Sequence, residues 1–141
     1  MAFVRTVRTR VRVRYAETDQ MGVVYHSNYF PWMEMGRVEL CRANGIRYRD
    51  LEANDGILLA VAEVACRFHH PARYDDEVDI DAFIIKAHPR MVTFGYRMTH
   101  AETGRKLATG ETRHVFVGRD MKPCKLPPKY FEVFGIDPRQ E

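Results

Sequence analysis

The sequence predicts an α+β domain in which a curved antiparallel sheet of five strands wraps around one long helix. Three observations indicate this. Residues 7–15 alternate between apolar and charged side chains, as a half-buried strand does. An apolar segment with helical spacing follows, and four strand-like runs with short turn signals come after it. We treat residues 1–141 as a single domain, because that length suits one hydrophobic core.

The composition fits a globular chain, with 45% hydrophobic and 29% charged residues. No apolar run approaches the roughly 20 residues of a membrane span, and MAFVRTVRTR lacks the apolar region of a signal peptide, so we expect a cytosolic protein. The net charge of +3 suits an anionic small ligand. Cys41, Cys66 and Cys124 match neither a zinc spacing nor a disulfide framework, and we expect inert thiols.

The first strand carries a row of arginines on one face, opposite a row of mainly valine side chains. The arginines are Arg8, Arg10, Arg12 and Arg14. Such a row is either a solvated face or a phosphate-binding one. A strand that binds nucleic acid would also present aromatic side chains between the charges, and this face has none, so we expect no nucleic-acid partner.

Residues 16–28 form a predicted loop, and a long helix follows it. Asn28 or Ser27 is a suitable N-cap, and Gly45 a suitable stop after Asn44. The buried stripe of the helix comprises Tyr29, Met33, Gly36, Leu40 and Ala43. A glycine in the middle of such a stripe indicates close packing, so we expect Gly36 to contact a strand.

The remainder of the chain reads as strands after a connection, residues 45–56, that holds a short helical turn. The predicted strands are residues 57–70, 77–88, 91–100 and 106–119, and a short segment lies at 130–134. Short loops between strands imply antiparallel neighbours. The sheet would have exposed edges, and an exposed edge can pair with a second subunit.

The stretch YAETDQMGVVYHSNYFPWMEMGR, residues 15–37, resembles the signature of the 4-hydroxybenzoyl-CoA thioesterase family, in its YbgC-type acyl-CoA thioesterase branch. The matching residues are Tyr15, Thr18, Asp19, Gly22, Val24, Tyr25, His26, Asn28, Tyr29 and Glu34, supported by Pro71, Ala72, Asp76, Lys86 and Arg90. The resemblance spans about residues 5–130. Met21 departs from it, since many members carry a small residue there, and this leaves the shape of the acyl pocket open.

The resemblance implies a hotdog fold and an acyl-CoA substrate. It implies no cofactor, because coenzyme A is part of the substrate. It also implies a dimer or tetramer with the active site at a subunit interface. The catalytic aspartate corresponds to Asp19, and the backbone N–H that polarises the thioester carbonyl corresponds to His26 at the helix start. Asp19 either attacks the carbonyl carbon, giving an acyl-enzyme anhydride, or activates a water molecule.

The remaining candidates each have a structural alternative. His26 could also act through its side chain, and Tyr25 either lines the pocket or fills the core. Asn28 either caps the helix or contacts substrate, and Glu34 either pairs with Arg37 or contacts substrate. Lys86 and Arg90 either bind the phosphates of coenzyme A or are solvated surface charges, as are Arg119, Lys122 and Lys125.

We expect no metal site, because the adjacent His69 and His70 point to opposite faces of a strand and the other histidines have no ligand spacing. The function that the sequence favours is an acyl-CoA thioesterase. Two alternatives remain open at this point. One is a thioesterase that acts on acyl groups carried by acyl carrier protein, and the other is a non-catalytic acyl-CoA-binding module.

Overall fold

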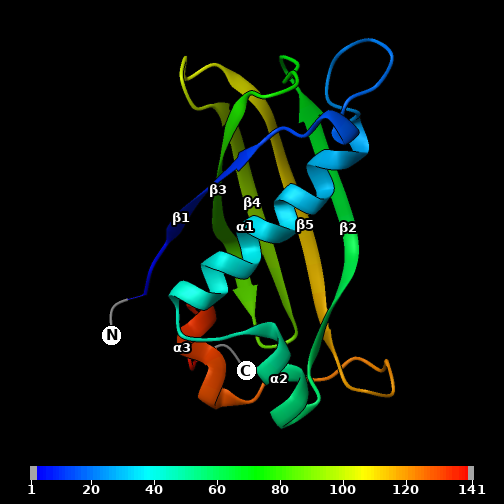
Figure 1. Cartoon of the computed structure of the whole chain (residues 1–141). Helices are drawn as coiled ribbons and strands as arrows, with labels where there is room; N and C mark the ends of the chain where they lie inside the picture. Colours follow the sequence, from blue (N-terminus) through cyan, green and yellow to red (C-terminus); the bar gives the residue numbers. More distant parts are fainter. Residues whose placement is uncertain (1–2, 140–141) are drawn as a thin grey trace.

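A computed structural model describes residues 3–139 as a five-stranded antiparallel sheet with one long helix on its concave face (Figure 1). The elements, in chain order, are β1 (Thr6–Arg12), α1 (Tyr29–Ala43), α2 (Tyr48–Asp55), β2 (Leu58–Phe68), β3 (Glu77–His88), β4 (Met91–His100), β5 (Lys106–Val117) and α3 (Phe131–Phe134). Short 3₁₀ turns at Tyr15–Glu17 and His26–Asn28 flank the loop before α1, and a third, Pro128–Tyr130, precedes α3. The predicted order of strands around one long helix is confirmed.

The strands lie in the order β1-β3-β4-β5-β2, so β1 and β2 form the two edges of the sheet. The prediction that short loops join neighbouring strands holds for β3–β4–β5 and is wrong for β2 and β3. β2 pairs with β5, and residues 69–76 cross the end of the sheet to reach β3. This crossing segment passes the loop before α1, where the N–H of Val24 donates to the carbonyl of Ala72 at 2.9 Å.

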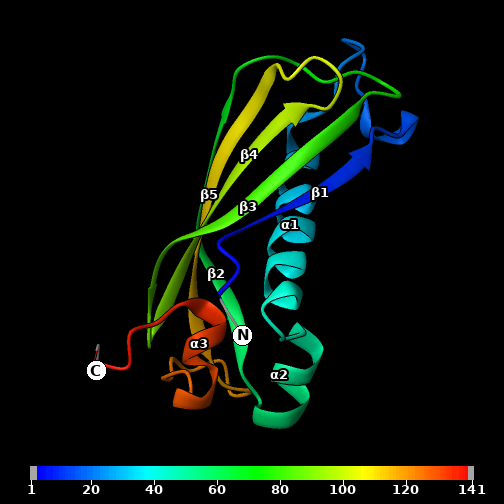
Figure 2. The same ribbon diagram turned by 90° about the vertical axis from the view of Figure 1, so that its left-hand side faces the viewer.

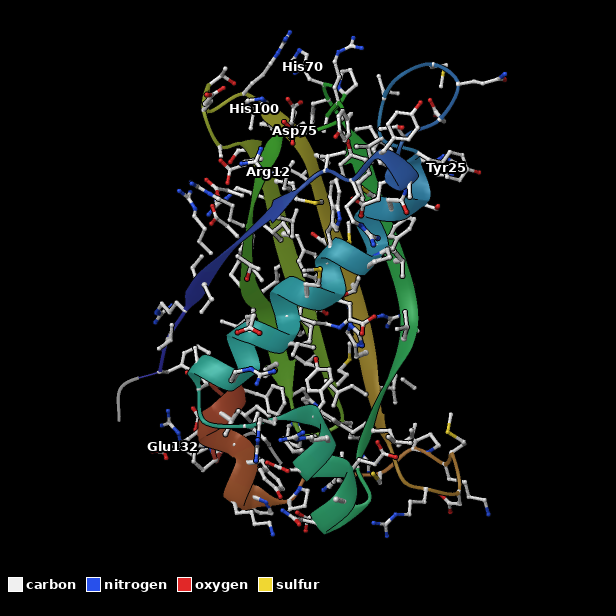
Figure 3. The ribbon with its side chains drawn as sticks, in the orientation of Figure 1. Arg12, Tyr25, His70, Asp75, His100 and Glu132 are labelled. Carbon is white, nitrogen blue, oxygen red and sulfur yellow. The ribbon has the colours of Figure 1, made fainter. Side chains whose placement is uncertain are left out.

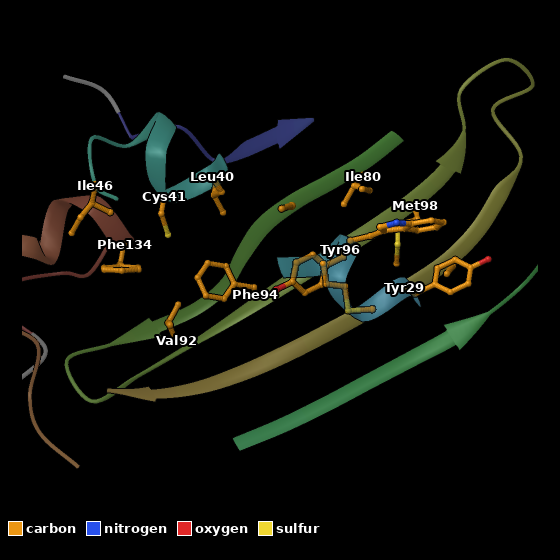
Figure 4. Close-up of a cluster of buried hydrophobic side chains, with 14 of the residues drawn as sticks. Tyr29, Leu40, Cys41, Ile46, Ile80, Val92, Phe94, Tyr96, Met98 and Phe134 are labelled. Carbon is orange, nitrogen blue, oxygen red and sulfur yellow. The ribbon is translucent and has the colours of Figure 1, made fainter. Parts of the chain in front are cut away.

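Helix α1 lies close against the sheet because Gly36 has no side chain. A Cβ atom at Gly36 would stand 3.0 Å from Cγ2 of Ile80 and 3.2 Å from Cβ of Ala82, both on β3. The predicted contact between Gly36 and a strand is confirmed. Figure 2 shows the helix on one side of the curved sheet, and Figure 4 shows buried side chains of both elements, Leu40 and Tyr96 among them.

The arginine row of β1 is paired with acidic side chains on the convex face of the sheet. Arg8 donates to both carboxylate oxygens of Asp81, at 2.8 and 3.0 Å, and Arg10 does the same to Asp79, at 2.8 and 3.2 Å. The hydrogen bonds from Arg10 hold the pKa of the Asp79 carboxyl below its usual range. The row is therefore occupied by ion pairs, which leaves less of its charge for phosphate groups.

The end of the sheet remote from the loop is closed by α2 and the C-terminal segment (Figure 1). α2 is a full eight-residue helix rather than the short turn predicted for this connection, and it ends at Gly56 with φ of +66°. Arg119 donates to the carbonyls of Glu52 and Ala53 at the end of α2. Strands β2 and β5 each end two residues earlier than predicted, at Phe68 and Val117.

Gly36→Val tests the close approach of α1 to the sheet. The branched side chain would overlap Ile80 and Ala82, so we expect a loss of about 1–3 kcal/mol of unfolding free energy. Urea denaturation measures it. Ala43, the last residue of the predicted buried stripe, is exposed at the end of α1, so that part of the prediction is wrong. Ala43→Val is therefore the control and should cost much less. A Gly36→Val variant as stable as the parent would show that α1 does not pack closely against β3 at this position, since helix propensity by itself favours valine over glycine.

Candidate active site

Asp19 lies in a tight turn of the loop before α1. Its backbone N–H donates to Val23 and its carbonyl accepts from Gly22, both at 2.9 Å. Gly22 has φ of +78°, a conformation that residues with a Cβ rarely adopt. The Oδ1 atom of Asp19 accepts the N–H of Met21 at 2.9 Å. One oxygen of the carboxylate thus holds the turn, and the other is left for chemistry.

Glu17 fixes this loop to the helix. Its side chain is nearly buried, and its two carboxylate oxygens accept the N–H of Arg14 at 2.7 Å and the indole N–H of Trp32 at 3.1 Å. Its backbone carbonyl accepts the N–H of Tyr25 at 2.9 Å and the side-chain amide of Asn28 at 2.8 Å. Two residues before Asp19, the chain is therefore held by four hydrogen bonds, two of which come from the residues that open the helix.

The start of the helix offers unpaired backbone donors. The turn His26–Asn28 leads directly into α1, so the first N–H groups of the combined helix are those of His26 and Ser27. Among the hydrogen bonds within residues 3–139, neither N–H donates to another protein group. Asn28 is the N-cap residue of α1, as predicted, but its side chain forms no capping hydrogen bond and donates to the carbonyl of Glu17 instead.

Asp19 and His26 line the same cleft, which has a volume of about 310 Å³. Tyr25, Tyr29 and Phe68 form its aromatic wall, and it also includes Met21, Val23, Val24, His69, His70 and Pro71. The ring of His26 lies 4.5 Å from that of Tyr25 and 6.2 Å from that of Phe68. Tyr25 is 47% exposed, so it lines the cleft rather than filling the core.

Figure 3 shows Tyr25 and His70 at the same end of the molecule, with Glu132 at the other end. His70 donates from Nδ1 to the carbonyl of Lys106 at 3.0 Å, and His69 approaches Thr109 at 3.2 Å. Both histidines are therefore held by β5. They frame the rim of the cleft opposite the helix start.

Four of the candidate residues do not line this cleft, namely Asn28, Glu34, Lys86 and Arg90. Glu34 lies farther along α1, where it borders two other hollows, and it forms no ion pair with Arg37. Lys86 is near the end of β3, and Arg90 is in the β3–β4 turn, whereas β3 begins beside the loop of Asp19. Within one chain, Lys86 and Arg90 are thus at the opposite end of the sheet from Asp19 (Figure 1).

The cleft is lined both by a carboxylate residue, Asp19, and by His26, whose backbone N–H has no partner within residues 3–139. A larger hollow of about 430 Å³ between β1 and α1 lacks a helix N-terminus. Residues 3–139 contain no group of three histidine, cysteine or acidic side chains placed to hold a metal ion. The three cysteines are unpaired, and burial raises the pKa of Cys41 to about 12 and that of Cys66 to about 11, which is unsuited to a nucleophile.

Sequence reasoning missed several residues of the site. Glu17 and Trp32 did not stand out, because a buried contact between a loop acid and an indole has no sequence period. The sequence predicts a strand that runs to His70, but β2 ends at Phe68, and His69 and His70 reach the cleft at the start of the crossing segment 69–76. Pro71 and Ala72 match the family resemblance, and this match is the one sequence signal that the segment belongs to the site.

Comparison with known proteins matches the Thioesterase-like superfamily over residues 13–134. The chain belongs to this superfamily. The acyl-CoA thioester hydrolase YbgC of Escherichia coli is 33% identical over 130 residues, covering 90% of this chain and 94% of that protein. The structure of a DHNA-CoA thioesterase from Staphylococcus aureus superposes with a TM-score of 0.87 at 29% identity, covering 92% of this chain and 89% of that one.

The 4-hydroxybenzoyl CoA thioesterase of Pseudomonas superposes with a TM-score of 0.84 over 92% of this chain and 99% of that one, at 19% identity, which bears on the fold alone. The predicted hotdog fold is confirmed for this thioesterase-like chain, with a sheet that does not close. Among the helices within residues 3–139, none combines the length and apolar character of a membrane-crossing helix.

Glu17→Gln tests the anchor of the Asp19 loop. A glutamine amide has one acceptor oxygen, so either the Arg14 N–H or the Trp32 indole N–H loses its partner. We expect a loss of about 1–3 kcal/mol of unfolding free energy. Glu39→Gln, which removes a surface ion pair with Arg42, is the control and should change stability by less than about 1 kcal/mol. A Glu17 variant as stable as the control would show that these two bonds do not hold the loop.

Proposed function

We propose that this protein hydrolyses acyl-CoA thioesters of small or medium acyl groups. One observation carries the proposal: Asp19 and His26, the residue with an unpaired N–H at the start of the helix, line one cleft. A thioester carbonyl that accepts from this N–H would present its carbon to Asp19. The names of YbgC and of the Staphylococcus aureus enzyme support a CoA thioester as substrate.

The reaction needs both the backbone N–H of His26 and the carboxylate of Asp19. The N–H of His26, and with it the positive end of the helix dipole, stabilises the negative charge that develops on the carbonyl oxygen. The free oxygen of Asp19 either bonds to the carbonyl carbon or takes a proton from a water molecule that does so. The C–S bond then breaks, the thiolate of coenzyme A takes up a proton, and water supplies the hydroxyl of the released acid.

The proposed catalytic groups are Asp19 and His26, with Tyr25 as an aromatic wall beside the reacting carbonyl. Asn28 is better explained as a tie between loop and helix than as a substrate contact, because its amide is engaged by Glu17. Both routes for Asp19 lead to the same products, and so does a side-chain role for His26 in addition to its N–H.

We further propose that the protein self-associates through β2. This edge strand exposes a row of apolar side chains, with Val61 53%, Val64 46% and Phe68 47% exposed. α1 contacts β1, β3 and β4 and leaves the concave side of β2 largely uncovered. β1, at the other edge, is a short strand whose alternate side chains are charged, which suits an edge that stays solvated.

Pairing of β2 with its copy about a two-fold axis reverses the second subunit. The end of one sheet that carries Asp19 would then lie beside the opposite end of the other. That opposite end carries the exposed cations Lys86, Arg90, Arg119 and Lys122. Their proposed role as contacts for the phosphates of coenzyme A therefore depends on the partner subunit.

Asp19→Asn tests the catalytic proposal. Asparagine keeps an oxygen that can accept the N–H of Met21, so the turn is preserved while the negative charge is removed. We expect the thiol-release rate on a panel of acyl-CoAs to fall about 10²–10⁴-fold, the usual value of a general base. Measuring the same acyl groups carried by acyl carrier protein shows whether the enzyme prefers that carrier or coenzyme A.

Asp50→Asn, on α2 and paired with Arg47, is the matched control and should retain the parent rate. A single turnover in ¹⁸O-labelled water probes the nucleophilic route: if water opens the anhydride at the carboxyl carbon of Asp19, the first product carries the unlabelled Asp19 oxygen and the label appears in the protein. Full activity of the Asp19 variant on every substrate would exclude the mechanism. Substrate binding without turnover by the parent would favour the non-catalytic module.

A double substitution, Val61→Lys with Val64→Lys, tests self-association. Two charges on the apolar row of β2 should convert the proposed dimer to monomer. Analytical ultracentrifugation gives the mass. Tyr74→Lys, at a position 56% exposed away from β2, should leave the mass unchanged. A monomeric parent, or a double variant of parental mass, would refute pairing through β2.

A further inference from the structure

Arg37 on α1 turns its side chain beneath the helix, toward the sheet. Its guanidinium lies close to the hydroxyl of Tyr96 on β4 and near Cys41, Tyr48 and His114. Its Nε atom is buried and has no hydrogen-bond partner, and among residues 3–139 no carboxylate forms an ion pair with it. A guanidinium half-buried without a counter-charge is costly and points to a partner that the chain itself does not supply.

The groups around Arg37 are neutral at physiological pH. Tyr96 and His114 each hydrogen-bond to the hydroxyl of Thr112, at 2.6 and 2.8 Å, and all three residues are buried. Burial, with the nearby Arg37 charge, lowers the pKa of His114 to about 4, and burial raises the pKa values of Cys41 and Tyr48. The polar cluster thus contributes hydrogen bonds to its own members and no negative charge to Arg37.

A pocket of about 280 Å³ opens onto Arg37 and Thr112 between α1 and β2. Its walls are apolar and comprise Phe30, Pro31, Val61 and Val64. The irregular pairing between Val61 and Glu63 lets Val61 and Val64 face the same side of β2 although they are three residues apart. Glu34 is at the exposed rim and is the one acidic side chain that lines this pocket.

This pocket and the Asp19 cleft follow one seam between α1 and β2. Tyr29 and Phe68, whose rings are 5.2 Å apart, border the cleft, and Val64 and Val61 continue the exposed row of β2 into the pocket. Arg37 is eight residues beyond Tyr29, which is about 12 Å along a helix. An acyl group whose thioester carbonyl lies at the helix start can therefore extend along the seam to Arg37.

We propose that Arg37 forms a subsite that binds a carboxylate at the far end of the acyl group, so that the preferred substrates are CoA monothioesters of dicarboxylic acids. The proposal rests on the proposed function and names its substrate class. A planar guanidinium fork matches a carboxylate, and the apolar walls accept the methylene chain between the two ends. Glu34 disfavours an anion at the rim, but it is solvated there and Arg37 is at the floor.

The experiment compares matched substrates on the parent protein and on Arg37→Met, which keeps an unbranched apolar stem and removes the guanidinium with its charge. Each pair of acyl-CoAs has the same chain length and ends in a carboxylate or a methyl group. We expect the parent to favour the carboxylate by about 10–100-fold in kcat/KM, the value of one charged hydrogen bond. The ratio should fall to about one or below in Arg37→Met.

Arg42→Met, at an exposed position of the same helix, should keep the parent ratio. If Arg37→Met does not fold, Arg37→Lys keeps the charge without the fork and should give an intermediate ratio. A parent that hydrolyses both members of every pair equally, or a ratio unchanged in Arg37→Met, would overturn the subsite.

A second measurement tests whether a free dicarboxylic acid binds at Arg37. If the acid raises the melting temperature of the parent but not of Arg37→Met, while the substrate ratio is one, the pocket binds free carboxylates and the acyl assignment is wrong. Failure of the proposed function looks different, because the parent would then hydrolyse no member of any pair.

Discussion

The geometry of the candidate site depends on the hydrogen bonds that converge on Glu17. The carboxylate of this residue holds Trp32 of α1 and the backbone of Arg14, and its carbonyl holds Tyr25 and Asn28. A loop with an acidic residue at its tip would otherwise sample many positions relative to a helix. The convergence fixes the separation between Asp19 and the helix start, and it does so with groups that are shielded from water and therefore strong.

A second constraint is the incomplete cover that α1 gives to the sheet. The glycine at position 36 brings the helix close to β3, so the helix is centred on β1, β3 and β4 rather than on the whole width of the sheet. The side of β2 that faces the helix is left bare as a consequence. Both the aromatic wall of the Asp19 cleft and the pocket beside Arg37 use this bare strip.

Much of the fold was predictable from local pattern. The alternation in β1, the stripe along α1 and the turn signals between β3, β4 and β5 each report a short-range preference. The place of β2 was not predictable in this way, because its pairing with β5 depends on a crossing whose length resembles that of a hairpin loop. Asp19 and His26 were found through a motif, whereas Glu17, Phe68 and Arg37 act through contacts between distant segments. The prediction of an ion pair between Glu34 and Arg37 failed because Arg37 turns inward.

The ion pairs between β1 and β3 have a consequence for assembly. The β2 edge of the sheet is apolar, whereas the β1 edge carries arginines that form ion pairs with Asp79 and Asp81. Copies that join along the apolar border leave only the two β1 borders facing outward, and these short strands with solvated ion pairs disfavour further strand addition. The sheet can therefore double without growing into an open filament.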